Sequence, residues 1–422
     1  MEESCAPGCA ARMSQVVTLA VDSIAAGGDG VGRSNGLVVF VPRTAAGDIV
    51  TASIAGKGQF ARGSLRAVTR PSRDRTVPPC PHYTHDKCGG CQLQHITYPG
   101  QLAAKQRIIR DAIERIGKRE LSAPEIRASS AEWRYRTKLT LAIRRRGANW
   151  IAGLRAYDDP SRVFSLTDCP ITERGVVRVW RDVMSASEHF PEAGELRGSV
   201  RLSEGAYTFS LEGGARWTKH EDFFAAAPSL SDLWWEQDGR GPALLHSRDA
   251  PGSRKKPGIS FAQINPAVAA ELHAHVIARA LSYSPARVVD AYSGAGATAI
   301  SLALSGVVVT AIELDQLASD WCARHLPEGS RAVRGRVEDE LPAALPADVV
   351  LLNPPRAGID EEVAASLEAH EQKPRSIIYV SCNPATLARD ISRLPSFRIA
   401  GVVAFDMFPQ TAHVETVCEL VP

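Results

Sequence analysis

The feature that most constrains the fold is a repeated pattern in the C-terminal part of the chain, where short apolar runs alternate with loops and helix-forming segments. Four such runs lie at 286–291, 307–313, 347–352 and 376–380, and they are rich in valine and isoleucine. Buried parallel strands joined by helices have this pattern. It predicts an open α/β sheet, with the polar groups that follow the strands gathered along one edge.

The loop after the first run, YSGAGA, indicates a ligand site. Gly294 and Gly296 allow the backbone to approach a ligand at the N-terminus of the next helix. Glu313 ends the second run, where a carboxylate suits a ribose diol. The loop lacks the lysine and the serine or threonine of a Walker motif, so nucleotide hydrolysis is not indicated.

A cysteine follows the fourth run. Ser376–Val380 predicts a strand, and Asn383 with Pro384 predicts a helix N-cap followed by proline in the first turn. Cys382 is therefore expected at a strand-to-helix turn, where the helix dipole lowers the pKa of a thiol and favours the thiolate. A lone cysteine is more often a small buried apolar residue, but the rest of the chain favours the reactive alternative.

The last stretch, from Phe397 to Val421, predicts two strands joined by a proline-containing loop, with Glu415 in the second strand. Desolvation among apolar neighbours would raise the pKa of this carboxylate and suit it to general-base catalysis. The alternative for Glu415 alone is an exposed carboxylate on an edge strand. Another N-cap and proline, Asn265 and Pro266, predict a helix that runs to about Leu281.

The N-terminal part predicts a small β-barrel. Between Ser14 and Pro71, short apolar runs alternate with glycine-rich turns, as in a five-stranded OB-like fold. Five arginines follow on or after its last strand, at positions 62, 66, 70, 73 and 75. They predict either a basic edge for single-stranded nucleic acid or an ordinary solvated face. Gln101–Gly117 is predicted to be a helix that ends at the glycine.

Cysteine spacing indicates a metal site. Cys80 precedes the CxxC pair Cys88 and Cys91, and Cys169 lies downstream before Pro170. Thiolates select zinc or iron–sulfur, and the spacing alone does not decide between them. A proline after the last ligand is typical of iron–sulfur sites. An odd total of nine cysteines predicts a reducing compartment, the cytoplasm.

The middle part, from Ala131 to Pro257, predicts a β-rich region with irregular connections. Residues 134–146 hold six cations and no carboxylate. Alternation along a strand would place Arg134, Arg136 and Lys138 on one side, as a phosphate-binding stripe or a solvated sheet face. A net charge of only +2 means that any nucleic-acid surface is local, and no apolar stretch reaches the length of a membrane span.

Together these motifs resemble the RNA 5-methyluridine methyltransferases, the S-adenosylmethionine-dependent enzymes that methylate carbon 5 of uridine in tRNA or rRNA. The resemblance covers nearly the whole chain, and FAQIN, the glycine loop, NPPRAG, SCNPATLARD and FPQTAHVE follow the family's order. It implies a Rossmann-like class I methyltransferase domain, an α/β fold with a mostly parallel seven-stranded sheet, preceded by a TRAM barrel and a β-rich central domain. The implied boundaries are a disordered leader at 1–13, the barrel at 14–72, the central domain at 73–98 and 120–257, and the methyltransferase domain at 99–119 and 258–422.

The resemblance also implies roles for single residues. Cys382 matches the nucleophile and Glu415 the general base. The positions that match S-adenosylmethionine-binding residues, with the two loop glycines, are Gln263, Tyr292, Gly294, Gly296, Glu313 and Asn353. The ligands of a 4Fe–4S cluster, preferred here to zinc, match Cys80, Cys88, Cys91 and Cys169.

The expected function is methyl transfer to carbon 5 of a uridine through a covalent cysteine–uracil adduct, by a cytoplasmic monomer whose RNA substrate is rRNA, with tRNA as the alternative. Two departures from the family pattern motivate alternatives: Asn353 stands where aspartate is usual, and Ala297 replaces a frequent asparagine. Asn-Pro-Pro resembles the motif of amino-group methyltransferases, and both changes would suit a non-catalytic RNA-binding relative. The spacing between Cys80 and Cys88 is also longer than the family's.

Overall fold

The computed structural model describes residues 15–55, 59–249 and 263–422; the predicted leader, Ser14, Phe261 and Ala262 lie outside them. The chain divides into two compact units. The barrel unit comprises the described residues up to Pro79, with Cys91–Ala104 and Gln410–Ala412. The main unit comprises Cys80–Gly90, Lys105–Pro409 and His413–Pro422.

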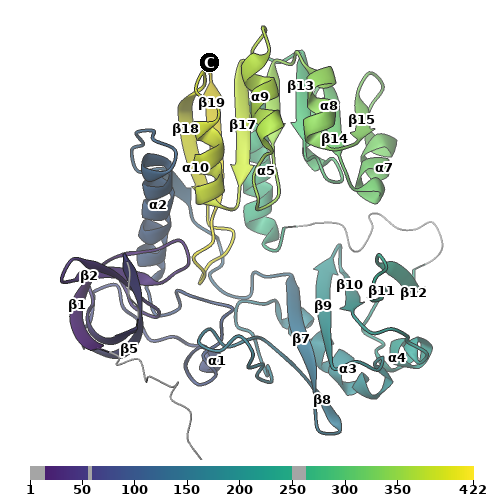
Figure 1. Cartoon of the computed structure of the whole chain (residues 1–422). Helices are drawn as coiled ribbons and strands as arrows, with labels where there is room; N and C mark the ends of the chain where they lie inside the picture. The colour runs from purple at the N-terminus through teal and green to yellow at the C-terminus, as the bar shows by residue number, and fades with distance from the viewer. Residues whose placement is uncertain (1–14, 56–58, 250–262) are drawn as a thin grey trace, which may run out of the picture. The chain divides into compact units, whose positions relative to one another are not determined.

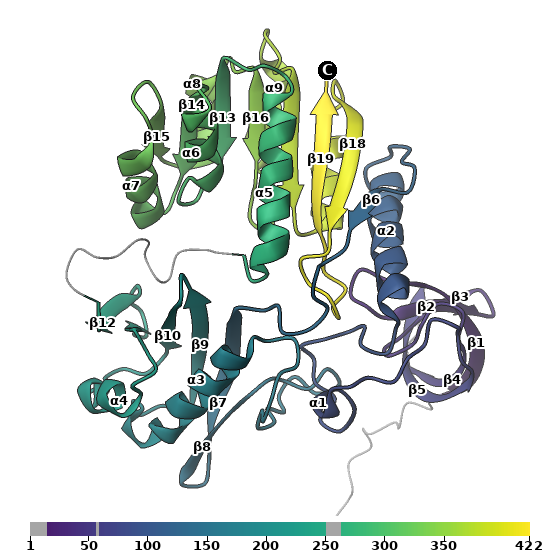
Figure 2. The same cartoon turned by 180° about the vertical axis from the view of Figure 1, so that it is seen from behind.

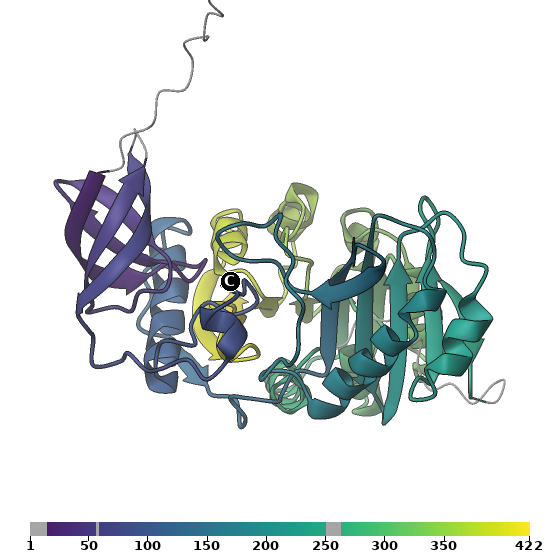
Figure 3. The same cartoon turned by 90° about the horizontal axis from the view of Figure 1, so that it is seen from below.

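The barrel unit contains the predicted five-stranded barrel, which is closed in the order β1-β2-β3-β5-β4 (Figure 3). Its strands are β1 (Gln15–Ile24), β2 (Gly30–Ser34), β3 (Leu37–Val41), β4 (Ile49–Ala55) and β5 (Phe60–Arg70). Val39, Val41 and Val50 are fully buried inside it. Arg75, one of the five predicted basic residues, forms an ion pair of 2.5 Å with buried Asp48, so its charge is already neutralised within the barrel unit.

The first sheet of the main unit has six strands in the order β12-β11-β10-β9-β7-β8. They are β7 (Lys138–Arg146), β8 (Asn149–Gly153), β9 (Glu195–Ser203), β10 (Ala206–Glu212), β11 (Asp232–Glu236) and β12 (Ala243–Ser247). Helices α3 (Arg174–Ser185) and α4 (His220–Ala226) and the turn η1 (Ser187–His189) accompany this sheet, and α1 (Pro81–Thr84) precedes it in the chain. Trp180 of α3 packs against the sheet and donates its indole N–H to the Leu139 carbonyl at 3.0 Å.

The second sheet of the main unit has eight strands in the order β15-β14-β13-β16-β17-β19-β18-β6 (Figure 1). They are β6 (Glu125–Arg127), β13 (Arg287–Ala291), β14 (Val308–Glu313), β15 (Arg331–Arg334), β16 (Val349–Leu352), β17 (Ser376–Ser381), β18 (Arg398–Phe405) and β19 (Glu415–Val421). All neighbours are parallel except β19, which is antiparallel to both β17 and β18. The predicted seven strands gain an eighth because β6, far upstream in the chain, pairs with β18.

Helices cover both faces of the eight-stranded sheet (Figures 1 and 2). One face packs against α2 (Tyr98–Arg115), α8 (Val337–Ala344), α9 (Glu361–Ala369) and α10 (Pro384–Ser392). The other packs against α5 (Pro266–Leu281), α6 (Ala297–Leu304) and α7 (Gln316–His325). The helices predicted after Asn265 and Asn383 are confirmed, whereas the predicted helix 101–117 begins earlier and leaves Ile116 45% exposed.

The central strands β16 and β17 are buried along their whole length, as a sheet covered on both faces requires. Polar groups that must reach a ligand are therefore confined to the strand ends. Within the described ranges, no helix is long and apolar enough to cross a membrane.

Candidate active site

The cofactor residues predicted from the sequence follow three adjacent strands. Tyr292 and Gly294 follow β13, Glu313 ends β14, and Asn353 follows β16. These strands are neighbours in the order β14-β13-β16, so their carboxyl ends meet at one edge of the sheet. The chain winds in opposite directions on either side of β13 and β16, and open α/β sheets bind ligands at such a reversal.

The glycine loop is hydrogen-bonded to the Glu313 carboxylate. The backbone N–H of Gly294 donates to one carboxylate oxygen of Glu313 at 2.8 Å, and the N–H of Asp315 donates to the other at 2.8 Å. Gly296 has a left-handed φ of 79°, and a Cβ atom there would lie 2.2 Å from the sulfur of Cys322. The close packing of the loop on α7 therefore requires glycine at this position.

Asp290, two positions before the loop, was not singled out from the sequence. Its side chain is buried within β13, and burial raises its carboxyl pKa to about 7. Within the described part of the chain, its Oδ2 atom has no hydrogen-bond partner. The signal in the sequence is a carboxylate inside the apolar run VVDA, and an unpaired buried oxygen beside a ligand loop is suited to a polar group of the ligand.

Cys382 and Glu415 come together through strand pairing. β17 and β19 are antiparallel, with Ser381 opposite Thr416. The next register position places Cys382 opposite Glu415, although the two lie far apart in the chain. Glu415 is only 5% exposed, so the alternative of a surface carboxylate is wrong.

The electrostatics at this pair differ from the sequence prediction. Burial and the nearby Glu415 carboxylate raise the pKa of the Cys382 thiol, although a hydrogen bond and the charge of Arg356 act in the opposite direction. The predicted lowering by the helix N-terminus is therefore wrong for this state of the protein. Burial raises the pKa of Glu415 to about 7, with Arg356 opposing the shift.

Arg356 was not predicted as a site residue, yet it acts on both groups. It belongs to the NPPRAG loop after β16, and it is exposed. A guanidinium that stabilises a thiolate by a charge-assisted hydrogen bond is a means of activating the cysteine once substrate is present. The sequence signal was an arginine that directly follows two prolines at a strand end.

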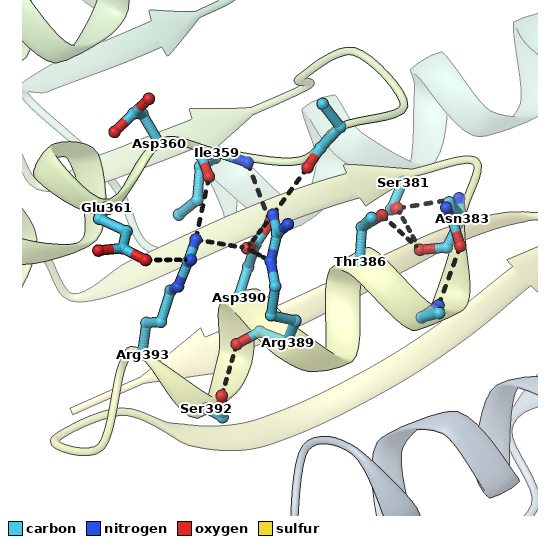
Figure 4. Close-up of polar contacts among 12 residues, drawn as sticks. Ile359, Asp360, Glu361, Ser381, Asn383, Thr386, Arg389, Asp390, Ser392 and Arg393 are labelled. Carbon is cyan, nitrogen blue, oxygen red and sulfur yellow. Dashed lines mark hydrogen bonds and ion pairs between the residues drawn. The ribbon is translucent and has the colours of Figure 1, made fainter.

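The turn that carries Cys382 is built by local polar contacts (Figure 4). The Asn383 side chain accepts from the Ala385 N–H at 3.1 Å, which confirms it as the N-cap of α10. The hydroxyl of Ser381 accepts from the Asn383 N–H at 3.1 Å, and the hydroxyl of Thr386 donates to the Asn383 carbonyl at 3.0 Å. The backbone on both sides of Cys382 is thus fixed.

Asp390 joins this turn to the NPPRAG loop (Figure 4). Its fully buried carboxylate accepts from the Ile359 N–H at 2.9 Å, from the Tyr379 hydroxyl at 2.7 Å and from the Arg389 guanidinium at 2.7 Å. Arg393 contacts the same carboxylate at 3.3 Å. Because Ile359 lies three positions after Arg356, this network connects the loop that bears the arginine to the helix that follows the cysteine.

A second buried ion pair anchors the loop that leads to Glu415. The ammonium of Lys105 on α2 lies 2.5 Å from the Asp406 carboxylate, and neither side chain is exposed. Lys105 also donates to the Phe408 carbonyl at 3.0 Å. Both acceptors belong to the segment between β18 and β19, so α2 helps to fix the start of β19.

The predicted metal site is not supported. Among the described residues, no group of three or more histidine, cysteine or acidic side chains is arranged to hold a metal ion. Cys80, Cys88 and Cys169 belong to the main unit and Cys91 to the barrel unit, and all four are buried.

Gln263, unlike the other predicted cofactor residues, does not follow a strand of the eight-stranded sheet. It is half-buried and precedes α5 by three positions, immediately after the segment that the structure does not describe. Asn353 is exposed after β16, where its N–H donates to the Ala291 carbonyl at 3.3 Å. Ala297 is exposed at the first position of α6.

The fold and this edge of the sheet define an α/β methyltransferase. The structure matches that of the Pyrococcus abyssi tRNA (uracil-54, C5)-methyltransferase, solved in complex with S-adenosyl-L-homocysteine, with a TM-score of 0.67 and 22% identity over 96% of this chain and 100% of that one. At this identity the likeness establishes the fold.

Sequence comparison establishes the family. Residues 329–421 match the family described as tRNA (uracil-5-)-methyltransferase. An uncharacterised RNA methyltransferase of Protochlamydia amoebophila is 31% identical over 95% of this chain and 96% of its own length. Another, of Gloeobacter violaceus, is 32% identical over 98% of both chains. The chain belongs to the RNA methyltransferase family that these relatives represent, and its C-terminal part matches the tRNA (uracil-5-)-methyltransferase model.

Proposed function

We propose that the protein methylates carbon 5 of a uridine in RNA through a transient covalent bond between Cys382 and the base. The observation that carries this proposal is the register that sets Cys382 opposite Glu415, with Arg356 acting on both. S-adenosylmethionine supplies the methyl group. Gly294, Gly296 and Glu313 are the residues at the sheet edge that would hold it.

Carbon 5 of uracil is a poor nucleophile, so the chemistry needs the cysteine. Addition of the Cys382 thiolate to carbon 6 would place an electron pair on carbon 5 and the adjacent carbonyl, which divides one difficult step into easier ones. Arg356 would favour the thiolate. After carbon 5 has taken the methyl group, it still carries its hydrogen.

Glu415 would complete the reaction as the base. Its carboxylate would remove the proton from carbon 5, and the electron pair of that C–H bond would re-form the C5–C6 double bond as the sulfur leaves carbon 6. A pKa near 7 leaves Glu415 partly ionised at neutral pH, so it can take up this proton. A uridine stacked in a helix would be out of reach of both side chains, so the target must be in a loop or be flipped out.

The identity of the RNA is a separate part of the proposal. We favour rRNA, with tRNA as the alternative. Mass-spectrometric mapping of 5-methyluridine in RNA from a strain that lacks the gene would identify the RNA and the position.

The covalent step is tested with RNA that contains 5-fluorouridine, because fluorine at carbon 5 cannot leave as a proton and the adduct persists. With methyl donor present, the wild-type protein is expected to form a stable adduct through residue 382, and Cys382→Ala none. An amino-group methyltransferase would keep its activity in Cys382→Ala, and a non-catalytic RNA-binding protein would show no turnover in any form.

A further inference from the structure

His413 is an exposed histidine close to the proposed catalytic pair. It lies two positions before Glu415, and Val414 between them is buried in the core on the α2 side of the eight-stranded sheet. Because side chains alternate along an extended chain, His413 and Glu415 project to the other side of the sheet, the side of α5.

The thiol of Cys382 projects to the same side. Val380 of β17 and Val417 of β19 belong to the core beneath α5, and each lies two positions from a member of the catalytic pair. Phe405, which is directly paired with Glu415, belongs to the same core. The thiol, the carboxylate and the imidazole therefore gather on one side of the sheet, at the strand ends.

An anchored aromatic ring orients the imidazole. The ring centroids of Phe408 and His413 lie 6.0 Å apart, and the rings meet edge-on at an angle of 73°. Phe408 packs against the core beneath α5, and its carbonyl accepts from the buried Lys105 ammonium at 3.0 Å. His413 is thus exposed, yet it has a fixed neighbour.

The imidazole is neutral at neutral pH. Desolvation by the surrounding protein lowers the pKa of His413, and the charges of Arg356, Lys105 and Arg136 act in the same direction. Arg356 is also the cation that acts on the thiol and the carboxylate of the catalytic pair, so one guanidinium lies near all three groups. A neutral imidazole keeps one N–H as a hydrogen-bond donor.

The proposed reaction needs a donor of this kind. When the Cys382 thiolate adds to carbon 6 of uracil, the electron pair of the C5–C6 double bond moves toward the carbonyl oxygen on carbon 4, which becomes an enolate oxygen. Methyl transfer returns that pair to the new bond at carbon 5. A donor aimed at the oxygen stabilises the charge while it exists, and loss of one such donor slows an enzyme by about a hundredfold to a thousandfold.

The order of the side chains at the sheet edge matches the order of the ring atoms. Cys382 and Glu415 face each other across the strand pair, as attack at carbon 6 and proton removal at carbon 5 require. His413 lies two strand residues beyond Glu415, about 6.7 Å further along the chain. The oxygen on carbon 4 is adjacent to carbon 5, so one uracil can contact all three side chains.

We propose that His413 is a further catalytic residue, whose imidazole N–H donates to the oxygen on carbon 4 of the target uracil and stabilises the enolate. The imidazole keeps its proton throughout, so the proton balance of the reaction is unchanged. This inference rests on the proposed function, because it requires the addition of Cys382 to the base.

The test combines a substitution in the protein with a substitution in the substrate. His413→Leu removes the donor, and His413→Asn keeps an N–H donor on a shorter side chain. The substrates are transcripts of the RNA identified by mapping, made with uridine, 4-thiouridine or 2-thiouridine, because sulfur accepts hydrogen bonds more weakly than oxygen. Single-turnover methyl transfer and RNA affinity by filter binding are measured for every combination.

The matched control is His370→Leu. His370 is a half-buried histidine that follows α9 and precedes β17, at the strand end away from Cys382. Its replacement should change neither the rate of methyl transfer nor the RNA affinity.

His413→Leu is expected to slow methyl transfer to uridine by about a hundredfold, and His413→Asn should recover about tenfold of that loss. RNA affinity should stay within about threefold of wild type, because the contact acts on the reacting base rather than on binding. With 4-thiouridine the loss in His413→Leu should shrink to about tenfold or less, whereas 2-thiouridine should show the full loss.

Equal losses with uridine and 4-thiouridine would overturn the inference. An RNA affinity that falls as far as the rate would also overturn it, since a phosphate contact predicts that result. If His413→Leu does not fold, the same comparison of uridine with 4-thiouridine is made with His413→Asn, and equal losses there refute the role. Absence of a 5-fluorouridine adduct in wild type contradicts the proposed function, whereas an adduct that forms as fast in His413→Leu as in wild type contradicts the role of His413 alone.

Discussion

The two sheets of the main unit place polar residues in different ways. The eight-stranded sheet is covered by helices on both faces, and its residues with proposed catalytic and cofactor roles lie at the strand ends. The six-stranded sheet packs α3 and α4 on one face and presents polar and charged residues on the other. A doubly covered sheet therefore concentrates chemistry at one edge, whereas a sheet covered on one face offers a broad surface.

The largest effect is expected at the edge of the doubly covered sheet. Cys382→Ser should lower methyl transfer by about a thousandfold or more, because the hydroxyl is a far weaker nucleophile at neutral pH. Single-turnover assays with the identified RNA measure this. Binding of S-adenosylhomocysteine should be unchanged, and a variant that retains most of its activity would remove the covalent mechanism.

The next effect is expected at Glu415. Glu415→Gln should slow turnover by about a hundredfold or more and accumulate the cysteine–uracil adduct, because the base is lost after the adduct has formed. Denaturing gels with radiolabelled RNA detect the adduct. In wild type, turnover should rise with pH through about 7 as Glu415 loses its proton; a profile that falls over this range would contradict the role.

The same variant makes a prediction about stability. The folded-state pKa of Glu415 is raised, so its neutral form stabilises the fold below the unfolded value of about 4.5, and this contribution is lost as pH rises through about 7. Glu415→Gln should thus match wild type near pH 4 and be more stable near pH 8, by on the order of 3 kcal/mol. Urea unfolding of wild type and Glu415→Gln at both pH values provides the comparison. Equal stability of the two proteins at pH 8 would contradict the raised pKa of Glu415.

A substitution at Asp390 tests whether the ligand edge of the eight-stranded sheet needs a buried carboxylate for its stability. Asp390→Asn removes the buried carboxylate that Arg389 and Arg393 share and sets an amide beside the Ile359 N–H, so it should destabilise the protein by about 3 kcal/mol. The rate of methyl transfer should fall even where the protein is folded, because the loop that bears Arg356 is released. Glu361→Gln, which affects only the exposed partner of Arg393, is the control and should cost less than about 1 kcal/mol.

The smallest effect is expected on the six-stranded sheet. Glu195 bridges Arg144 and Arg155 at 2.6 and 2.5 Å, but all three side chains are partly exposed. Glu195→Gln should destabilise the protein by no more than about 1 kcal/mol. A loss as large as that of Asp390→Asn would show that the contrast between the two sheets does not extend to their ion pairs.

The sequence predicted much of this architecture because local patterns decide it. The β-branched runs, the Asn383 cap and the glycine loop are each specified within a few residues, and the structure places them as expected. The eighth strand was missed because β6 is three residues long and its partner lies far downstream. Asp390 and Lys105 were missed for a similar reason, since their importance depends on burial and on partners distant in the chain.

The electrostatic predictions were the least accurate, because they depend on the whole environment. The helix N-terminus at Cys382 was correctly located, yet burial and Glu415 outweigh it. The basic stripe was drawn along one strand, whereas the Arg134 guanidinium is bound to the Asp168 carboxylate.

The pairing of β17 with β19 has a consequence for how this site tolerates change during evolution. The separation between the Cys382 sulfur and the Glu415 carboxylate depends on the backbone hydrogen bonds that set the register of β17 and β19. A shift of β19 by a single residue would turn Glu415 to the other side of the sheet. Mutations that alter the alignment of the two strands are thus expected to abolish the proposed reaction.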